Sequence, residues 1–192
     1  MRNWFVLPAL SKLIGYDLDE LGITVCSVSG TNFAPYIRLL APKGLNIPFA
    51  VITDLDPQAD NANLGEARLL TLLKLLASPV DLAGKNVQQK LALAAEKGLF
   101  LNDYTFEVDL FRCGRHKSMG KTLIELAVSE PAKDRARQWI DDPAELDPRV
   151  MLRDISAIGK GRFAQRLAAN LRNTECPPYI KNALDYVTAR CQ

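Results

Sequence analysis

The sequence lacks the features that define several classes of protein. Its 192 residues include one histidine and four cysteines, with no Cys-x-x-Cys pair: Cys26, Cys113, Cys176 and Cys191. Because structural zinc sites need clustered Cys and His ligands, we expect no structural zinc and reduced thiols. The apolar segment at residues 1–15 is short and is interrupted by polar residues before it reaches a membrane-spanning length. We therefore expect a cytoplasmic protein without a membrane partner.

Charge of one sign is also lacking. The chain has 24 basic and 22 acidic residues, which leaves a formal net charge of +2. No overall field therefore attracts a nucleic acid or a membrane, and any such binding must come from local patches. The hydrophobic content of 48 % at this length is enough to bury a core without disulfides or metals.

Two short apolar runs predict buried strands. Residues 23–28 (ITVCSV) and 49–53 (FAVIT) have the β-branched composition of strands covered on both faces in a parallel sheet. Residues 35–41 between them are typical of a crossover helix. A third strand is expected within residues 99–110, where residues 104–110 alternate polar and apolar side chains. The pattern predicts an α/β fold with a mainly parallel sheet flanked by helices.

Helical periodicity covers most of the remaining chain. The predicted helices are residues 4–14, 64–77, 81–97, 118–128, 131–140, 161–173 and 179–190. The acidic stretch at residues 141–148 contains prolines and indicates a surface connection. We expect a catalytic core over residues 1–128 and a helical extension over residues 129–192.

Asp54 and Asp56 follow the best-defined predicted strand. Ligands bind at the carboxyl ends of strands in open parallel sheets. Residues two apart in an extended chain point to the same side, so both carboxylates could ligate Mg²⁺ or Mn²⁺. The alternative is that Asp54 caps a loop that starts at Asp56 and Pro57.

Glu107 and Asp109 repeat this arrangement on the third predicted strand. If that strand is adjacent in the sheet, its carboxylates converge on Asp54 and Asp56. Like charges this close repel unless a cation neutralises them, so the cluster indicates a metal site. The alternative is an exposed edge strand with a polar face.

Two loops contain residues suited to phosphate chemistry. Ser29, Gly30, Thr31 and Asn32 follow the first predicted strand, and their backbone N–H groups could face a phosphate. A plain turn with Thr31 or Asn32 as a helix cap is the alternative. Lys160 lies between two glycines before a predicted helix, where a fixed cation would stabilise the charge of a pentacovalent transition state. The alternative is a solvated loop lysine.

The most basic stretch of the chain follows Asp109. We assign nucleic-acid contacts to four of its residues and to one residue near Lys160, namely Arg112, Arg115, Lys117, Lys121 and Arg162. His116 belongs to the same stretch. A basic loop beside an acidic metal site suits a nucleic-acid backbone, whereas a solvated surface is the alternative interpretation.

Four motifs together resemble the Toprim region of overcoming-lysogenization-defect (OLD) family nucleases. They are LPAL at residues 7–10, SVSGTNF at 27–33, AVITDLD at 50–56 and GKGRFA at 159–164. The resemblance extends over residues 7–168. It implies a Rossmann-like Toprim core with added helices that binds divalent metal and hydrolyses DNA. It also implies that Asp54 and Asp56 ligate metal, that Asp109 with Glu107 supplies further acidic ligands, and that Lys160 assists catalysis.

The sequence departs from this family pattern in two ways. Toprim domains begin with a strand that ends in Glu-Gly-x-x-Glu, and Met-Arg-Asn stands in that place, with Asn3 near the second glutamate. No Walker motif of the family's ATPase occurs, so an ATPase domain or partner subunit is expected outside this chain.

Two functions therefore compete. The first is a DNA endonuclease that uses two metal ions. The second is a non-catalytic truncated Toprim fragment that acts as a structural or interaction module, and an open sheet edge would then favour a homodimer. A primase-like or topoisomerase-like activity is disfavoured, because a zinc-ribbon cysteine pattern and an evident tyrosine-bearing cleavage domain are both missing.

Overall fold

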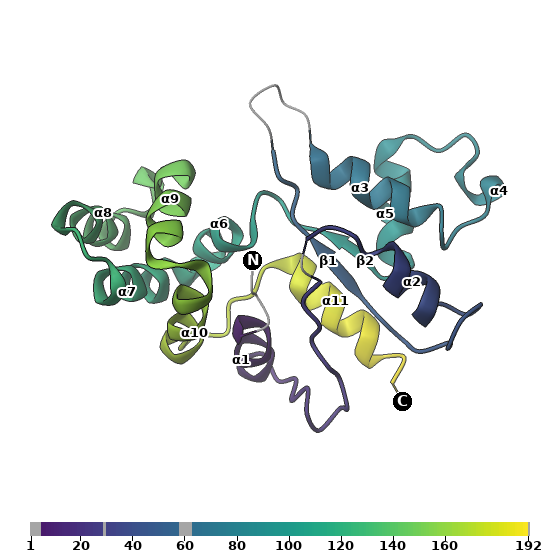
Figure 1. Ribbon diagram of the computed structural model, residues 1–192, viewed down its shortest axis with the longest axis horizontal. Coiled ribbons are helices and arrows are strands. Elements are labelled where there is room, and N and C mark those ends of the chain that lie inside the picture. The colour runs from purple at the N-terminus through teal and green to yellow at the C-terminus, as the bar shows by residue number, and fades with distance from the viewer. Residues whose placement is uncertain (1–4, 29, 58–62, 192) are drawn as a thin grey trace. The chain divides into compact units, whose positions relative to one another are not determined.

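The computed structural model describes residues 5–28, 30–57 and 63–191. The chain divides into two compact units (Figure 1). The helical unit comprises residues 1–27 and 106–177, and the sheet unit comprises residues 28–105 and 178–192. The expected boundary between residues 128 and 129 does not coincide with a boundary between these units, because it falls inside the helical unit.

A parallel pair of strands forms the centre of the sheet unit. Strands β1 (Val51–Thr53) and β2 (Leu99–Leu101) pair with Val51 opposite Leu99. The connection between them contains helices α3 (Leu64–Leu73), α4 (Pro79–Leu82) and α5 (Val87–Glu96). Parallel neighbours need such a long crossover. The unit also contains α2 (Ala34–Leu40) and α11 (Pro178–Thr188), so the predicted parallel sheet with flanking helices is confirmed.

Helices cover both faces of this small sheet. Successive strand residues point to opposite faces. Leu99 packs into a core with Ile37, Leu69 and Leu73, which brings α2 and α3 onto one face. Phe100, the next residue, meets Tyr186 of α11 edge to face with ring centroids 5.9 Å apart. Helix α11 therefore packs on the sheet and belongs to the sheet unit.

The helical unit is a bundle around α7 (His116–Leu126). Helices α8 (Glu130–Asp141) and α10 (Lys160–Asn170) both pack against α7, and α10 also contacts α1 (Val6–Leu13) and α9 (Pro148–Ile158). Helix α9 was not predicted. Its start signal is nonetheless readable, because Asp147 accepts hydrogen bonds from the backbone N–H groups of Arg149 and Val150, and Pro148 takes the first helical position.

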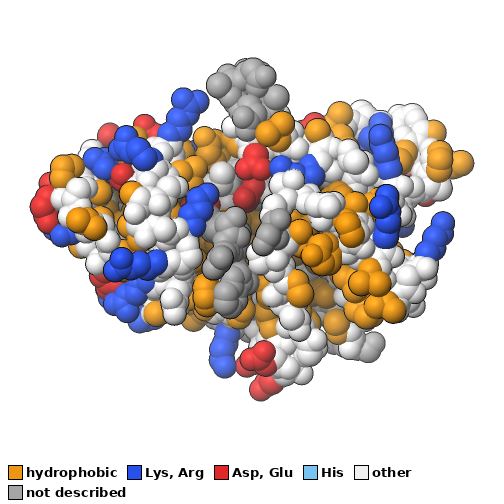
Figure 2. All heavy atoms as spheres, viewed as in Figure 1, with side chains coloured by type: hydrophobic (Ala, Val, Ile, Leu, Met, Phe, Trp, Pro, Cys, Tyr) orange, Lys and Arg blue, Asp and Glu red, His pale blue; other side chains and the backbone are white. Residues whose placement is uncertain are grey.

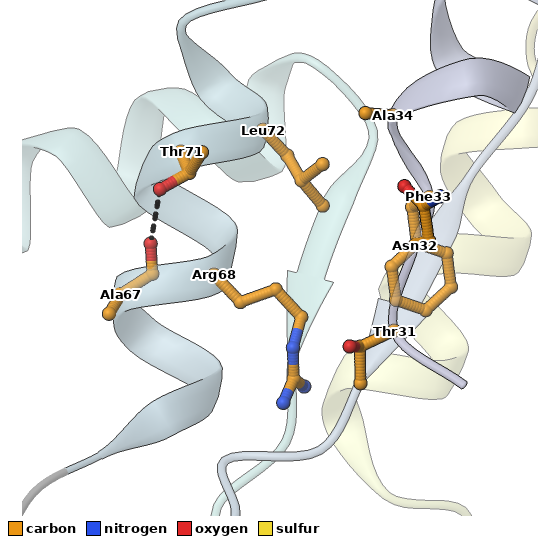
Figure 3. Close-up of a pocket in the computed structure, with 8 residues that line it drawn as sticks. All are labelled: Thr31, Asn32, Phe33, Ala34, Ala67, Arg68, Thr71 and Leu72. Atoms are coloured by element: carbon orange, nitrogen blue, oxygen red, sulfur yellow. Dashed lines mark hydrogen bonds between the residues drawn. The ribbon is translucent and has the colours of Figure 1, made fainter.

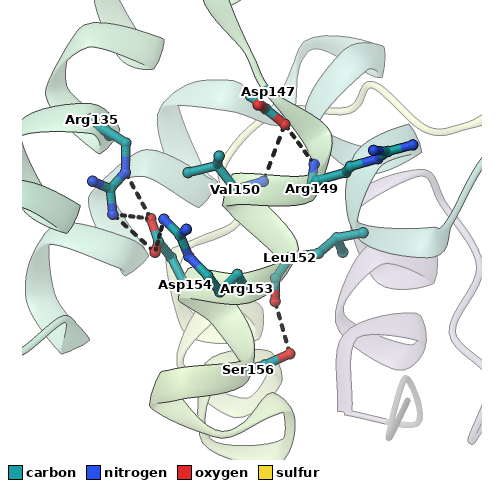
Figure 4. Close-up of polar contacts among 8 residues, drawn as sticks. All are labelled: Arg135, Asp147, Arg149, Val150, Leu152, Arg153, Asp154 and Ser156. Carbon is teal, nitrogen blue, oxygen red and sulfur yellow. Dashed lines mark hydrogen bonds and ion pairs between the residues drawn. The ribbon is translucent and has the colours of Figure 1, made fainter.

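Figure 4 shows how α9 is fixed to α8. The guanidinium of Arg135 donates to both carboxylate oxygens of Asp154, with Nε to Oδ2 at 3.1 Å and Nη2 to Oδ1 at 2.9 Å. Asp154 is only 8 % exposed. A bidentate pair of this kind fixes orientation as well as distance. It therefore positions α9, whose end leads through Gly159 into α10.

One predicted strand is wrong, and another lies at the start of its predicted range: the strand expected within residues 99–110 is β2 at Leu99–Leu101. Residues 23–28 form no strand, and the backbone N–H of Ile23 donates to the carbonyl oxygen of Leu18 at 2.8 Å. Residues 104–110 alternate in polarity, yet α6 (Phe106–Leu110) is a helix. All five residues of α6 are buried, including Glu107 and Asp109. The alternation was misleading, because alternating polarity indicates a strand only where one face of the segment is exposed to solvent. Trp4 and Ser29, which belong to two other predictions, lie outside the described residues.

The connection from α6 to α7 is irregular. The segment η2 (Phe111–Arg115) contains a kink at Cys113 and Gly114, where Gly114 has a φ of +99°. Such a φ favours glycine, which has no Cβ to clash with the backbone. In the part of the chain that the structure describes, we find no helix both long and apolar enough to cross a membrane.

The close packing of α7 on α8 gives a stability prediction. A Cβ on Gly120 would overlap the side chain of Ile140 and lie 3.1 Å from the carbonyl oxygen of Ala136. We expect Gly120→Ala to lower the free energy of unfolding by about 1–3 kcal/mol, measured by urea denaturation. The neighbouring exposed change Lys121→Ala should stay within about 0.5 kcal/mol of the unchanged chain. A Gly120→Ala chain as stable as this control would contradict the packing.

Candidate metal centre

The chain after β1 is held by one side chain that follows β2. Asn102 lies directly beyond β2, and its side-chain Oδ1 accepts the backbone N–H of Leu55 at 2.6 Å. Its Nδ2 donates to Asp54 Oδ1 at 2.6 Å. Asn102 is only 3 % exposed, so this amide has little freedom to rotate. It fixes the backbone of the loop and the orientation of the Asp54 carboxylate together.

A second side chain holds the same loop from α3. Arg68 Nη1 donates to Thr53 Oγ1 at 2.7 Å, and Arg68 Nη2 pairs with Asp56 Oδ2 at 3.1 Å. Asp56 has a φ of +50°, a left-handed conformation that aspartate tolerates better than most residues. The extended geometry assumed for Asp54 and Asp56 therefore ends before Asp56. The direction of the Asp56 carboxylate is set by Arg68 and not by strand alternation.

A glycine lets α3 approach the loop closely enough for this contact. The backbone N–H of Gly65 donates to Leu55 O at 2.8 Å. A Cβ on Gly65 would overlap the carbonyl oxygen of Asp54 and lie 2.7 Å from Leu55 Cα. Both obstacles are backbone atoms, which cannot rotate away. Glycine at the start of α3 therefore places Arg68, three residues later, within reach of the loop.

Asn102 and Arg68 were both missed as site residues by sequence reasoning. Asn102 could have been found, because it follows one strand of a parallel pair as Asp54 follows the other. Arg68 had no comparable signal. Its pairing with Asp56 depends on the direction in which α3 leaves the loop, which periodicity does not give.

The donor chemistry of this loop suits a hard cation. Asp54 and Asp56 offer carboxylate oxygens, the ligand type that Mg²⁺ and Mn²⁺ prefer. Among the described residues, no group of three or more His, Cys, Asp and Glu side chains is placed to hold a metal ion. A pair of carboxylates suits a cation that keeps water or substrate oxygens as its other ligands.

Glu107 and Asp109 are not at a strand end. They lie on α6 in the helical unit, with 3 % and 6 % of their surface exposed, whereas Asp54 and Asp56 belong to the sheet unit. The four carboxylates therefore do not lie at the ends of two adjacent strands, as the sequence had predicted. Their role as metal ligands stays a prediction.

Lys160 is the first residue of α10 and is exposed. The preceding Gly159 has a φ of +94°, which allows the sharp turn between α9 and α10. The predicted glycine turn is therefore present, although Lys160 itself already belongs to the helix. Its proposed contact with phosphate is untested.

Exposed basic side chains lie on both α7 and α10. Lys117 and Lys121 are exposed and one helical turn apart on α7, and Glu125 follows on the same face. Glu125 pairs with Arg166 of α10, which shares a face with Arg162. We call Lys117, Lys121, Lys160 and Arg162 the basic surface. Figure 2 shows Lys and Arg side chains over these helices. Arg112 is also exposed.

Arg115 is not on this surface. Its side chain is fully buried, and Nε donates to the carbonyl oxygen of Glu175 at 2.7 Å. Burial lowers the pKa of its guanidinium, and the neighbouring Cys113 and Glu175 partly offset this effect. The prediction that Arg115 contacts nucleic acid is therefore wrong. The residue instead ties the kink before α7 to the chain beyond α10.

The turn before α2 lines a pocket. Neither Thr31 nor Asn32 caps α2, because the cap position is Phe33 and no side chain accepts a hydrogen bond there. Figure 3 shows the segment that carries these three residues opposite α3. The pocket between them has a volume of about 360 Å³ and is lined by Thr31, Asn32, Phe33, Ala34, Ala67, Arg68, Thr71 and Leu72.

The chain is similar to solved structures over almost its whole length. The C-terminal region of the Burkholderia pseudomallei OLD protein is 42 % identical, with a TM-score of 0.88, over 98 % of this chain and 93 % of that one. The C-terminal region of the Xanthomonas campestris pv. campestris OLD protein is 39 % identical, with a TM-score of 0.86, over 98 % of this chain and 90 % of that one.

The family described as "Overcoming lysogenization defect protein-like, TOPRIM domain" matches residues 4–56, which include Asp54 and Asp56. The comparison with curated proteins gave no significant match. Identity of this extent over nearly the full chain establishes common descent with the OLD structures. The chain therefore belongs to the overcoming-lysogenization-defect (OLD) family, and it is similar to the C-terminal region of those proteins.

Proposed function

We propose that this chain provides the catalytic region of a divalent-metal-dependent DNA endonuclease. The observation that carries the proposal is the carboxylate pair after β1, in which Asn102 orients Asp54 and Arg68 holds Asp56. The pair lies within the residues that match the TOPRIM family. A loop fixed from two sides is suited to catalysis, because its groups need little reorganisation during the reaction.

Asp54 and Asp56 would hold Mg²⁺ or Mn²⁺. Water and phosphate oxygens would complete the coordination, as is common for Mg²⁺ bound through one or two carboxylates. When bound, such ions supply an activated water and offset charge on the transferring phosphate in a two-metal hydrolysis. Asp109 and Glu107 stay proposed as further acidic ligands.

Each charged group has its own proposed role. The guanidinium of Arg68 offsets the charge of Asp56, so two acidic side chains can share one short loop without a large repulsion. Lys160 would stabilise the extra negative charge of the transition state. Arg112 and the basic surface would contact the DNA backbone. An ATPase partner, a homodimer and a cytoplasmic location stay predictions.

The first test is cleavage of supercoiled plasmid in Mg²⁺ or Mn²⁺. We expect Asp54→Asn to slow nicking more than about 100-fold, because even residues that only support a metal ligand contribute 10–100-fold. The control variant Asp185→Asn, which changes a carboxylate on α11 of the same unit, should nick plasmid at the rate of the unsubstituted chain. A folded chain that nicks no plasmid with either metal would contradict the proposal and favour the non-catalytic module.

Lys160 is tested by separating binding from chemistry. Lys160→Ala should lower the single-turnover nicking rate about 10²–10³-fold, with DNA affinity nearly unchanged, because the charge that it offsets develops only in the transition state. Lys160→Arg should keep part of the rate. If Lys160→Ala weakens binding and leaves the rate at saturating enzyme intact, the lysine is a binding residue only.

The basic surface is tested by the salt dependence of DNA binding. Each phosphate contact adds about one unit to the slope of log K against log salt. The double variant Lys117→Ala and Lys121→Ala should therefore reduce the slope by about two, measured by fluorescence anisotropy on duplex DNA. Lys133, which pairs with Glu130 at 2.7 Å, gives the control Lys133→Ala. An unchanged slope in the double variant would remove α7 from the DNA interface.

A further inference from the structure

The pocket between α2 and α3 shares a wall with the carboxylate pair. Arg68 lines the pocket, and the same guanidinium bonds Asp56 Oδ2 at 3.1 Å and Thr53 Oγ1 at 2.7 Å. A group that occupies the pocket therefore lies one side chain away from the proposed metal centre. Within the proposed nuclease function, that is the place of a nucleotide next to the cut phosphate.

The lining of the pocket suits a flat ring with polar edges. Phe33 offers an aromatic face, and Leu72 offers an apolar wall from α3. In Figure 3 the side chains of Arg68 and Leu72 point from α3 toward the segment that carries Thr31 and Phe33. Asn32 and Thr31 add hydrogen-bonding groups. No carboxylate is among the described residues that line the pocket, so nothing there repels the acceptor-rich edge of a base.

The size of the pocket limits the ligand. A volume of about 360 Å³ is near the lower end of the range for ligand pockets, which is about 300–1,000 Å³. This is room for a base or a nucleoside. Nucleic-acid enzymes commonly receive single bases in such pockets, with stacking on aromatic side chains.

We propose that this pocket receives an unpaired base of the DNA strand, stacked on Phe33, from a nucleotide that flanks the cut phosphate. The inference rests on the proposed nuclease function and adds a substrate class to it. DNA that is already unpaired near the cut should be preferred, because removing a base from a duplex costs stacking and pairing energy.

The experiment compares two DNA substrates of one sequence, a continuous duplex and a duplex with a short unpaired bubble, nicked in Mn²⁺. The bubble should be nicked about tenfold faster, the scale of one base–aromatic stacking contact. Phe33→Leu keeps an apolar side chain against the core but removes the aromatic face, and it should bring the bubble rate down to that of the duplex. Ala34→Leu, which narrows the pocket, should do the same.

The control is Tyr36→Ala, which removes a half-exposed aromatic ring from the same helix outside the pocket lining and should keep the preference for the bubble. Thermal melting identifies any variant that fails to fold. Equal nicking rates on both substrates, with no effect of Phe33→Leu or Ala34→Leu, would overturn the inference. Nicking that depends on the Asp54 carboxylate would be unaffected by that result.

A binding measurement separates the pocket from catalysis. In Mg²⁺, the Asp54→Asn variant should bind the bubble DNA without cutting it. The bubble carries the fluorescent base 2-aminopurine. Stacking on Phe33 should quench the fluorescence, and Phe33→Leu in the same background should abolish the quenching. Quenching without nicking by any chain would refute the nuclease proposal alone, whereas nicking without quenching would refute the base pocket alone.

Discussion

The parallel pairing of β1 with β2 is the constraint on which the candidate site depends. With Thr53 opposite Leu101, the residues that follow the two strands begin side by side. Asn102 can therefore bond both the backbone of Leu55 and the carboxylate of Asp54. Two residues that are far apart in the sequence thus form one rigid unit at a strand end. A shift of the register by one residue would separate them, because side-chain direction alternates along a strand.

The sheet is small, and the helices around it do most of the positioning. Gly65 lets α3 touch the loop after β1, and Arg68 then reaches back to Thr53 and Asp56. The same helix supplies Leu69 and Leu73 to the core beneath Leu99. Packing and site geometry are therefore coupled through one helix, because its apolar face fixes the position from which Arg68 contacts the loop.

Sequence reasoning predicted the two acidic residues of the candidate site but not the side chains that hold them. Asp54 and Asp56 could be predicted because a β-branched run followed by acidic residues marks the carboxyl end of a buried strand. Asn102 could have been found from its place directly after β2, whereas Arg68 could not, because its contacts depend on the direction in which α3 leaves the loop. Glu107 and Asp109 show the opposite failure. Their alternation with apolar neighbours is typical of a strand. Because every residue of this segment is buried, the same alternation is equally compatible with a short helix.

The order of the two units along the chain has a consequence for folding during synthesis. The helical unit is inserted between the parts of the sheet unit, whose last helix α11 begins at Pro178. The sheet face that carries Phe100 therefore has no Tyr186 ring to cover it until α11 has left the ribosome. Neither unit is a continuous stretch of sequence. The sheet unit can complete its core only after the helical unit has been made, so a ribosome that stops early releases an exposed apolar sheet.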